Sequence, residues 1–339
     1  MTNNMNKKKH VKIIAEIGVN HNGSFDTAME MIRTAKKCGV DCVKFQIAKP
    51  ELSISKYADK AKYQINNTGN TESQLEMCKS FELPFEYFAE FKKECERLNL
   101  EFLATPFDLA GIDYLESIGV DSYKIPSGEV TNLPYLEKIA KLHKPIILST
   151  GMCSMDDVGI TIDILKKNGA VDITILHCTT EYPAPYNEVN LLAMNSLKDK
   201  FGYPIGYSDH TMGIEVSIAA VALGAMVVEK HFTLDRKLKG PDHIASIEPN
   251  ELERMVKAIR NIEMSLGTAE KKASKSEEET IKIARKSIVA KKDIMLGEIY
   301  TEENLAIKRP GTGISPLEWY NLLGKRAKRN YKEDELIER

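Results

Sequence analysis

The fold of this chain is constrained most by a regular alternation of short apolar runs with amphipathic helical segments. The runs are rich in Ile, Val and Leu, as expected of parallel strands that are covered on both faces. Eight such runs occupy the first four-fifths of the chain: Val11–Val19, Cys42–Ile47, Glu101–Thr105, Ser122–Pro126, Pro145–Thr150, Ile173–Cys178, Pro204–Tyr207 and Ala225–Glu229. Between the first two, Phe25, Met29, Ile32 and Ala35 recur at helical spacing. Eight strand–helix units over roughly 250 residues are typical of a (β/α)₈ TIM barrel.

A doubly wound open sheet is the main alternative to the barrel, because it also alternates parallel strands with helices. Open sheets that bind dinucleotides carry a glycine-rich turn after the first strand, and this chain has no such turn there. We therefore predict an α/β fold of the TIM-barrel type.

The composition changes after the last predicted barrel helix, Pro249–Leu266. We predict a solvated linker with a charged run over residues 267–283. Residues 284–339 contain two short strands, Ser287–Ala290 and Ala306–Arg309, and a small helix that begins after Ser315. The chain is thus predicted to have a barrel domain over 1–266 and a small domain over 284–339. A domain of that size needs a surface to pack against.

One long polar segment interrupts the alternation. It lies between Ala48 and Leu83, and the stretch Tyr63–Asn70 within it predicts a loop. Loops of this length in compact domains are usually functional or disordered. On a barrel this one would lie over the mouth, so we expect a lid.

Charge balance and cysteine spacing restrict the class of protein. Lys and Arg number 47 and Asp and Glu 49, giving a net charge of −2, so no basic surface predicts nucleic-acid or membrane binding. Met1–His10 lacks the apolar centre of a signal peptide, and no segment has transmembrane length. The six cysteines form no C-x-x-C pair, as expected of reduced thiols. These features predict a cytoplasmic protein.

Two histidines that follow consecutive strand-like runs predict a metal site. His210 follows the Pro204–Tyr207 run and His231 follows Ala225–Glu229, with the acids Asp209 and Glu229 close by. A strand–helix–strand unit brings the ends of two parallel strands side by side, so both imidazoles would face one mouth. Imidazole and oxygen ligands with open positions suit Mn²⁺, Fe²⁺, Co²⁺ or Zn²⁺.

Two lysines inside apolar strands predict an anion pocket at the same mouth. A buried charge is costly unless it is paired or faces a ligand. The polar residues at the strand ends would suit a phosphate and a carboxylate: Lys44, Thr105, Lys124, Ser127, Ser149 and Ser208. The alternative is that each lysine pairs with a buried carboxylate such as Glu16 or Glu129. The residues alone thus indicate a metal-assisted enzyme for a phosphorylated acid and a carbonyl compound.

At these positions the chain resembles the sialic acid synthase family. The matching stretches are Ala15–Gly23, Val43–Gln46, Lys124–Glu129, Leu148–Met152, Ser208–Thr211, Glu229–Thr233 and Gly240–Asp242. In the tail, Lys308–Ile314 resembles the antifreeze-like (SAF) domain that ends these synthases. The resemblance covers nearly the whole chain in order.

The resemblance implies condensation of phosphoenolpyruvate with an N-acylated hexose aldehyde, with release of phosphate by C–O cleavage. His210 and His231 would hold a divalent ion, with Mn²⁺ expected and Mg²⁺ or Co²⁺ as alternatives. Glu16 would transfer a proton or orient the water. The residues implied to bind phosphoenolpyruvate are Lys44, Thr105, Lys124, Ser127, Ser149, Thr180 and Ser208.

The resemblance also implies a sugar site and a partner. Glu129, Tyr182 and Asp242 would hold sugar hydroxyls. Arg309 of the tail would reach the N-acyl group in another subunit, which implies a domain-swapped homodimer.

The sugar itself stays open at this point. N-Acetylneuraminate synthase, using N-acetylmannosamine, is the first hypothesis. Some family members have Asn where this chain has Thr180, whereas legionaminate synthases share Thr-Thr-Glu-Tyr-Pro. Legionaminate synthase, using 2,4-diacetamido-2,4,6-trideoxy-mannose, is therefore the close alternative. A Schiff-base pyruvate aldolase using Lys44 or Lys124, and a non-catalytic carbohydrate-binding protein, are the other classes considered.

Overall fold

The computed structural model describes residues 10–69 and 72–338, so most of the stretch Met1–His10, for which no signal peptide is expected, lies outside the described residues. The chain divides into two compact units, Met1–Gly267 and Thr268–Arg339. All six cysteines are free thiols, as their spacing predicts. Among the described residues, no helix combines the length and apolarity needed to cross a bilayer.

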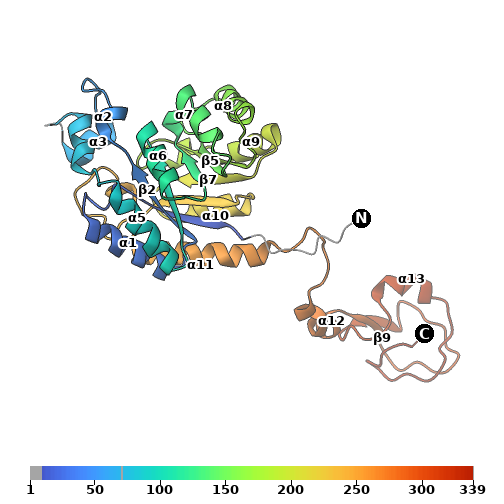
Figure 1. The fold of residues 1–339 in the computed structure, drawn as a ribbon. Helices are drawn as coiled ribbons and strands as arrows, with labels where there is room; N and C mark the ends of the chain where they lie inside the picture. The colour runs from blue at the N-terminus through green and yellow to red at the C-terminus, as the bar shows by residue number, and fades with distance from the viewer. Residues whose placement is uncertain (1–9, 70–71, 339) are drawn as a thin grey trace. The chain divides into compact units, whose positions relative to one another are not determined.

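The first unit is built around eight parallel strands that curl into a barrel (Figure 1). The order of strands around it is β3-β2-β1-β8-β7-β6-β5-β4, and β3 and β4 at the two ends of this order lie side by side. The strands are β1 (Lys12–Gly18), β2 (Cys42–Ile47), β3 (Glu101–Pro106), β4 (Tyr123–Ile125), β5 (Ile146–Ser149), β6 (Ile173–Cys178), β7 (Ile205–Asp209) and β8 (Val227–His231). The predicted TIM-barrel fold is confirmed.

Helices surround the strands, as the apolar spacing predicts. They are α1 (Phe25–Lys37), α5 (Glu86–Arg97), α6 (Leu109–Ser117), α7 (Leu133–Ala140), α8 (Met155–Lys167), α9 (Ala193–Phe201), α10 (Glu215–Ala222) and α11 (Pro249–Leu266). Most are amphipathic, whereas α10 is apolar on nearly all sides. The α1 helix begins because the Ser24 side chain accepts a hydrogen bond from Thr27 N and Asp26 complements the helix dipole. Its buried face consists of Ala28, Met31, Ile32 and Ala35, so the face predicted from Phe25 and Met29 is slightly rotated.

The two last strands extend further toward the polar residues than their apolar runs suggest. The β7 strand continues to Asp209 and β8 to His231, although the runs that predict them end at Tyr207 and Glu229. Hydrogen bonding to neighbouring strands keeps polar residues in the sheet as well as apolar ones. The barrel therefore carries charged and hydroxyl side chains at its mouth on rigid strands.

The interruption between Ala48 and Leu83 is not the loop that its polarity predicts. It contains three short helices, α2 (Pro50–Ser53), α3 (Lys62–Thr68) and α4 (Gln74–Ser80). The prediction for Tyr63–Thr68 is thus wrong, while Asn70 lies outside the described residues. The buried ammonium of Lys60 holds this segment together, because it donates to Thr68 Oγ1 and Gly69 O and pairs with Glu72.

The second unit has its own small core. Strands β9 (Ser287–Ala290) and β10 (Leu305–Lys308) pair antiparallel, and Ser315 caps a 3₁₀ turn that leads into α13 (Trp319–Leu322). The predicted linker is only partly irregular, because Lys275–Glu277 forms a 3₁₀ helix and Glu278–Ala284 forms α12. Ser274 and Glu277 cap this helical segment reciprocally, which the charge pattern alone did not indicate.

Candidate active site

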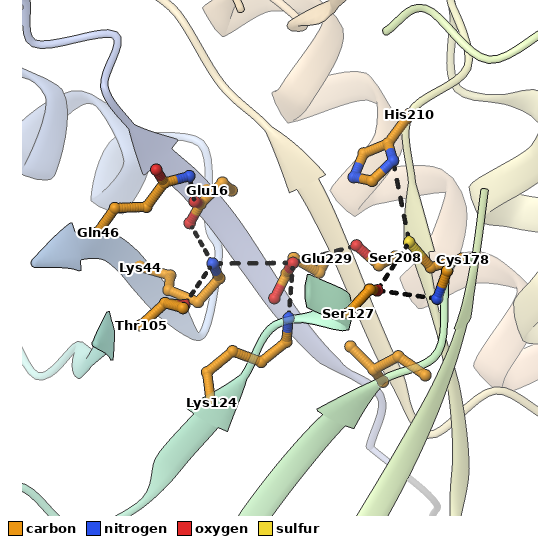
Figure 2. A network of polar contacts seen from close by, with 12 residues as sticks. Glu16, Lys44, Gln46, Thr105, Lys124, Ser127, Cys178, Ser208, His210 and Glu229 are labelled. Carbon is orange, nitrogen blue, oxygen red and sulfur yellow. Dashed lines mark hydrogen bonds and ion pairs between the residues drawn. The ribbon is translucent and has the colours of Figure 1, made fainter. Parts of the chain in front are cut away.

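Polar side chains from strands around the whole barrel converge at the carboxyl ends of the strands (Figure 2). This is the face at which TIM-barrel enzymes carry their active sites. Two adjoining cavities open there, one of about 170 Å³ and one of about 380 Å³. The smaller is lined by these predicted site residues: Glu16, Lys44, Thr105, Lys124, Ser127, Ser149, Thr180, Tyr182, Ser208, His210 and His231.

The two lysines of the smaller cavity are held by two buried carboxylates. Lys44 Nζ lies 2.8 Å from Glu16 Oε2 and 3.0 Å from Thr105 Oγ1. Glu229 Oε1 lies 3.4 Å from Lys124 Nζ and 3.8 Å from Lys44 Nζ. The predicted alternative of a carboxylate partner therefore holds for Glu16, whereas Glu129 contacts neither lysine and Glu229 takes its place.

The sequence analysis placed Glu229 beside the histidines. The alternation of side chains along its strand could have shown that it lies in the pocket of the two lysines. Side chains alternate along a strand, so the residue two before His231 points to the same inner face. The same rule applies to Gln46, two residues after Lys44, which borders both cavities and donates to Glu16 Oε1 at 3.1 Å. Gln46 is a site residue that the sequence analysis missed.

Opposite charges decide which carboxylate is ionised in this pocket. Burial alone would raise the pKa of Glu229, but Lys124 and Lys44 outweigh it and lower the pKa to about 2. Burial raises the pKa of Glu16, and the neighbouring Lys44 offsets only part of that rise. Two ammonium groups thus face one firmly ionised carboxylate, an arrangement that favours an incoming anion.

Hydroxyl groups complete the smaller cavity. Ser127 Oγ accepts from Gly151 N at 2.8 Å, and Ser208 Oγ donates to Glu229 Oε1 at 3.1 Å. Ser149 Oγ is buried and has no hydrogen-bond partner within the described residues. A buried polar atom without a partner is rare in folded proteins, so this hydroxyl is available to a ligand.

The two predicted metal-binding histidines lie together, with ring centroids 5.4 Å apart. The Nδ1 of His210 donates to Thr179 O at 2.7 Å, which leaves Nε2 as the atom with a free lone pair. Burial lowers the pKa of His231 well below its ordinary value, so its ring is neutral, the form that binds metals. The His231 Nδ1 is buried and unpartnered. Both rings therefore fit a divalent ion.

The acids expected beside the histidines do not join them, and that part of the prediction is wrong. Asp209 points to the other side of its strand, where it pairs with Lys230 at 2.9 Å, and Glu229 serves the lysines. Asp242 is the acid that approaches, at 3.8 Å from His231 Nδ1. Within residues 10–69 and 72–338, no group of three His, Cys, Asp or Glu side chains forms a complete metal site. The remaining positions around an ion would be open.

The predicted sugar residues Glu129, Tyr182 and Asp242 border the larger cavity. Tyr182 lies against His210, with centroids 4.2 Å apart. Burial, with a smaller contribution from Glu16, raises the pKa of Asp242 to about 7. Arg309 belongs to the second unit, where it is exposed and its Nε donates to Ala284 O. Its contact with a sugar stays a prediction.

The larger cavity shares a wall with the smaller one. Five residues border both: Gln46, Phe107, Thr180, Tyr182 and His231. A molecule in the larger cavity can therefore contact a molecule in the smaller cavity, the predicted anion pocket, beside the histidines. The arrangement suits a reaction between an anion and a second, larger substrate.

Comparison with known proteins agrees with this arrangement. The chain matches the NeuB family over residues 31–271 and the SAF domain over residues 285–338. It is 55% identical to N,N'-diacetyllegionaminic acid synthase of Campylobacter jejuni, over 97% of this chain and 99% of that protein. It is 46% identical to the Legionella pneumophila protein of the same name, over 94% of this chain and 90% of that protein.

A solved structure supports the same family assignment. The N-acetylneuraminic acid (sialic acid) synthetase of Leptospira borgpetersenii, in complex with citrate, is similar with a TM-score of 0.71. It is 34% identical, and the match covers 83% of this chain and 94% of that one. The resemblance seen in the sequence is confirmed, and the chain belongs to the NeuB family of sialic acid synthases, with a C-terminal SAF domain.

Proposed function

We propose that this enzyme condenses phosphoenolpyruvate with 2,4-diacetamido-2,4,6-trideoxy-mannose to form N,N'-diacetyllegionaminate and phosphate. The observation that carries the choice of sugar is the 55% identity, over nearly the full length of both chains, to the Campylobacter jejuni enzyme of that name. N-Acetylmannosamine, the first hypothesis from the sequence, becomes the second candidate. It is supported by the 34% identical Leptospira synthetase.

The anion pocket supports phosphoenolpyruvate as the first substrate. Lys44 and Lys124 would neutralise its phosphate and carboxylate, as compact point charges do. Ser149, the hydroxyl without a partner, would donate to it, together with the neighbouring Thr105, Ser127, Thr180 and Ser208.

The proposed reaction balances with one water. Carbon 3 of phosphoenolpyruvate bonds to the aldehyde carbon of the sugar, and water adds at carbon 2. The C–O bond to the bridging oxygen then breaks, and that oxygen leaves with the phosphate. Glu16, which pairs with Lys44 and has a raised pKa, would orient this water or accept its proton.

His210 and His231 would hold the divalent ion, with Mn²⁺ expected and Mg²⁺ or Co²⁺ as alternatives. The ion, when bound, supplies Lewis-acid polarisation of the sugar aldehyde. The neutral ring of His231, with its unpartnered Nδ1, and the free Nε2 of His210 support this assignment. Asp242, which is half-protonated near neutral pH, would hold a sugar hydroxyl with Glu129 and Tyr182.

Arg309 would reach the N-acyl group of the acceptor from a second copy of the chain in a domain-swapped homodimer. An exposed guanidinium with a single backbone contact is free to make such an interaction. We place the reaction in the cytoplasm, because phosphoenolpyruvate is an intracellular metabolite.

A competition between the two sugars tests the choice of acceptor. Purified enzyme with phosphoenolpyruvate and Mn²⁺ should release phosphate with the diacetamido sugar at a kcat/KM at least about tenfold above that with N-acetylmannosamine. A preference for N-acetylmannosamine would favour the second candidate instead. Release of phosphate with neither sugar would refute both, and borohydride trapping of pyruvate on a lysine would point to the aldolase.

A further inference from the structure

The larger cavity has a polar and an apolar end. Its polar end is the wall shared with the smaller cavity, which includes Tyr182 and His231. Gln46 also belongs to this wall and donates to Glu16 Oε1 (Figure 2). The acceptor aldehyde must lie at this wall, since it has to reach carbon 3 of phosphoenolpyruvate. The rest of the sugar then extends into the larger cavity.

The other end of this cavity is apolar and comes mostly from the segment between Ala48 and Leu83, with Phe88 contributed by α5. We name it the apolar wall, and it consists of Pro50, Ile54, Met77, Phe81, Leu83 and Phe88. Met77, Leu83 and Phe88 are deeply buried, with exposed fractions of 2%, 4% and 1%. Among the polar side chains that line the cavity near this wall, Gln64 Oε1 accepts from Ala61 N, Ser53 and Glu82 are exposed, and Gln74 is half-buried.

The segment that carries the apolar wall is fixed to the barrel rather than free. Asn67 Nδ2 donates to Pro241 O at 2.6 Å, next to Asp242. The Tyr63 ring lies against Tyr182, with centroids 5.0 Å apart. Helices α2 and α3 lie together at one side of the barrel (Figure 1). The wall thus stands at a set distance from the reacting centre.

We infer that the apolar wall receives the terminal carbon of the acceptor and selects sugars in which that carbon is a methyl group. A hydroxyl on the terminal carbon would be buried against Met77, Leu83 and Phe88 without a hydrogen-bond partner. A methyl group loses nothing there and gains contact. This inference rests on the proposed reaction and names the feature of the acceptor that the enzyme selects.

Two sugars that differ only at carbon 6 test this inference. They are 2,4-diacetamido-2,4,6-trideoxy-mannose and its counterpart with a hydroxyl at carbon 6. A hydrophobic pocket discriminates against an added hydroxyl by about tenfold to a hundredfold. We expect the wild-type kcat/KM to favour the 6-deoxy sugar by that factor, with the KM for phosphoenolpyruvate the same for both.

Variants at Met77 locate the discrimination. Met77→Gln keeps the length of the side chain and adds hydrogen-bonding groups, so it should reduce the preference by about tenfold. Met77→Leu, the matched apolar control, should preserve it. If Met77→Gln does not fold, Ile54→Thr with Ile54→Val as its control makes the same comparison at a less buried position.

The outcomes separate this inference from the proposed function. Equal use of the two sugars by the wild type, or equal changes in Met77→Gln and Met77→Leu, would overturn the role of the apolar wall while leaving the reaction in place. Turnover of neither sugar, with N-acetylmannosamine accepted, would overturn the proposed acceptor itself. A retained preference in the folded Met77→Gln and Ile54→Thr variants would also overturn the inference.

Discussion

At the scale of residues, the site depends on one carboxylate oxygen that serves three neighbours. Glu229 Oε1 lies 3.1 Å from Ser208 Oγ, 3.4 Å from Lys124 Nζ and 3.8 Å from Lys44 Nζ. All four side chains are buried, so the charges are poorly screened and must be balanced within the pocket. Glu229 balances them before a substrate arrives.

In Glu229→Gln, the stability of the folded protein should therefore depend on whether an anion is bound in the pocket. Removing the charge leaves two buried ammonium groups undercompensated, which should lower the free energy of unfolding by about 1–3 kcal/mol. Phosphoenolpyruvate should restore stability in this variant more than it stabilises the wild type. Urea unfolding with and without phosphoenolpyruvate measures both effects.

Asp209→Asn is the matched control for that experiment. Asp209 pairs with Lys230, also fully buried, but neither residue borders the anion pocket. This variant should lose stability without rescue by phosphoenolpyruvate. Rescue of both variants to the same extent would contradict the role given to Glu229.

His231→Ala should lower metal-dependent turnover by about a thousandfold or more while the circular dichroism spectrum stays unchanged. It removes one of the two histidines proposed to hold the ion, from a barrel whose apolar core lies elsewhere. His177→Ala is the control, because its imidazole bonds to Val189 O and borders neither cavity. Unchanged turnover in His231→Ala, measured as phosphate release across a Mn²⁺ titration, would remove this histidine from the metal site.

At the scale of elements, a buried acid joins two helices of the ring. Glu94 of α5 accepts from Arg33 of α1 at 2.7 Å and from Arg97 of its own helix at 2.7 Å. These hydrogen bonds from the two arginines lower the pKa of Glu94 to about 2. The folded protein therefore holds this carboxylate ionised where the unfolded chain, with its ordinary pKa of 4.5, would protonate it.

A lowered pKa in the folded state contributes stability above the ordinary pKa, and that stability is lost as the pH falls from about 4.5 toward 2. Glu94→Gln should lower the free energy of unfolding by about 1 kcal/mol at pH 7. The difference from wild type should shrink as the pH falls through that window. Urea unfolding at pH 7 and pH 3.5 checks this, with the exposed Glu90→Gln as control. A difference that is independent of pH would contradict the ion-pair account.

At the scale of the whole molecule, the barrel could be predicted because its strands are covered on both faces and read as plain apolar runs. The anion pocket could be predicted for the same reason, since Lys44 and Lys124 are conspicuous within such runs. Sequence reasoning failed where polar residues continue a strand, and so it misassigned Glu229 and missed Gln46. It also took the polar helices near Ala48–Leu83 for a loop, although the Ser73 and Glu76 capping box was a usable signal.

The tail should act on the acceptor and not on phosphoenolpyruvate. Arg309→Ala should raise the KM for the diacetamido sugar by about tenfold, the usual effect of losing a charged hydrogen bond. Lys308→Ala is the neighbouring control, because that lysine pairs with Asp334 within the second unit. Steady-state kinetics with each substrate varied in turn would contradict the assignment if only the KM for phosphoenolpyruvate changed.

The fate of the bridging oxygen of phosphoenolpyruvate tests the central claim most directly. The enzyme is supplied with the diacetamido sugar, Mn²⁺ and phosphoenolpyruvate that carries ¹⁸O at the bridging oxygen. The masses of both products are then measured by mass spectrometry. Cleavage of the C–O bond predicts that the label leaves in the phosphate and that the nine-carbon keto acid is unlabelled. Label retained in the keto acid, or a keto acid formed without release of phosphate, would contradict the account.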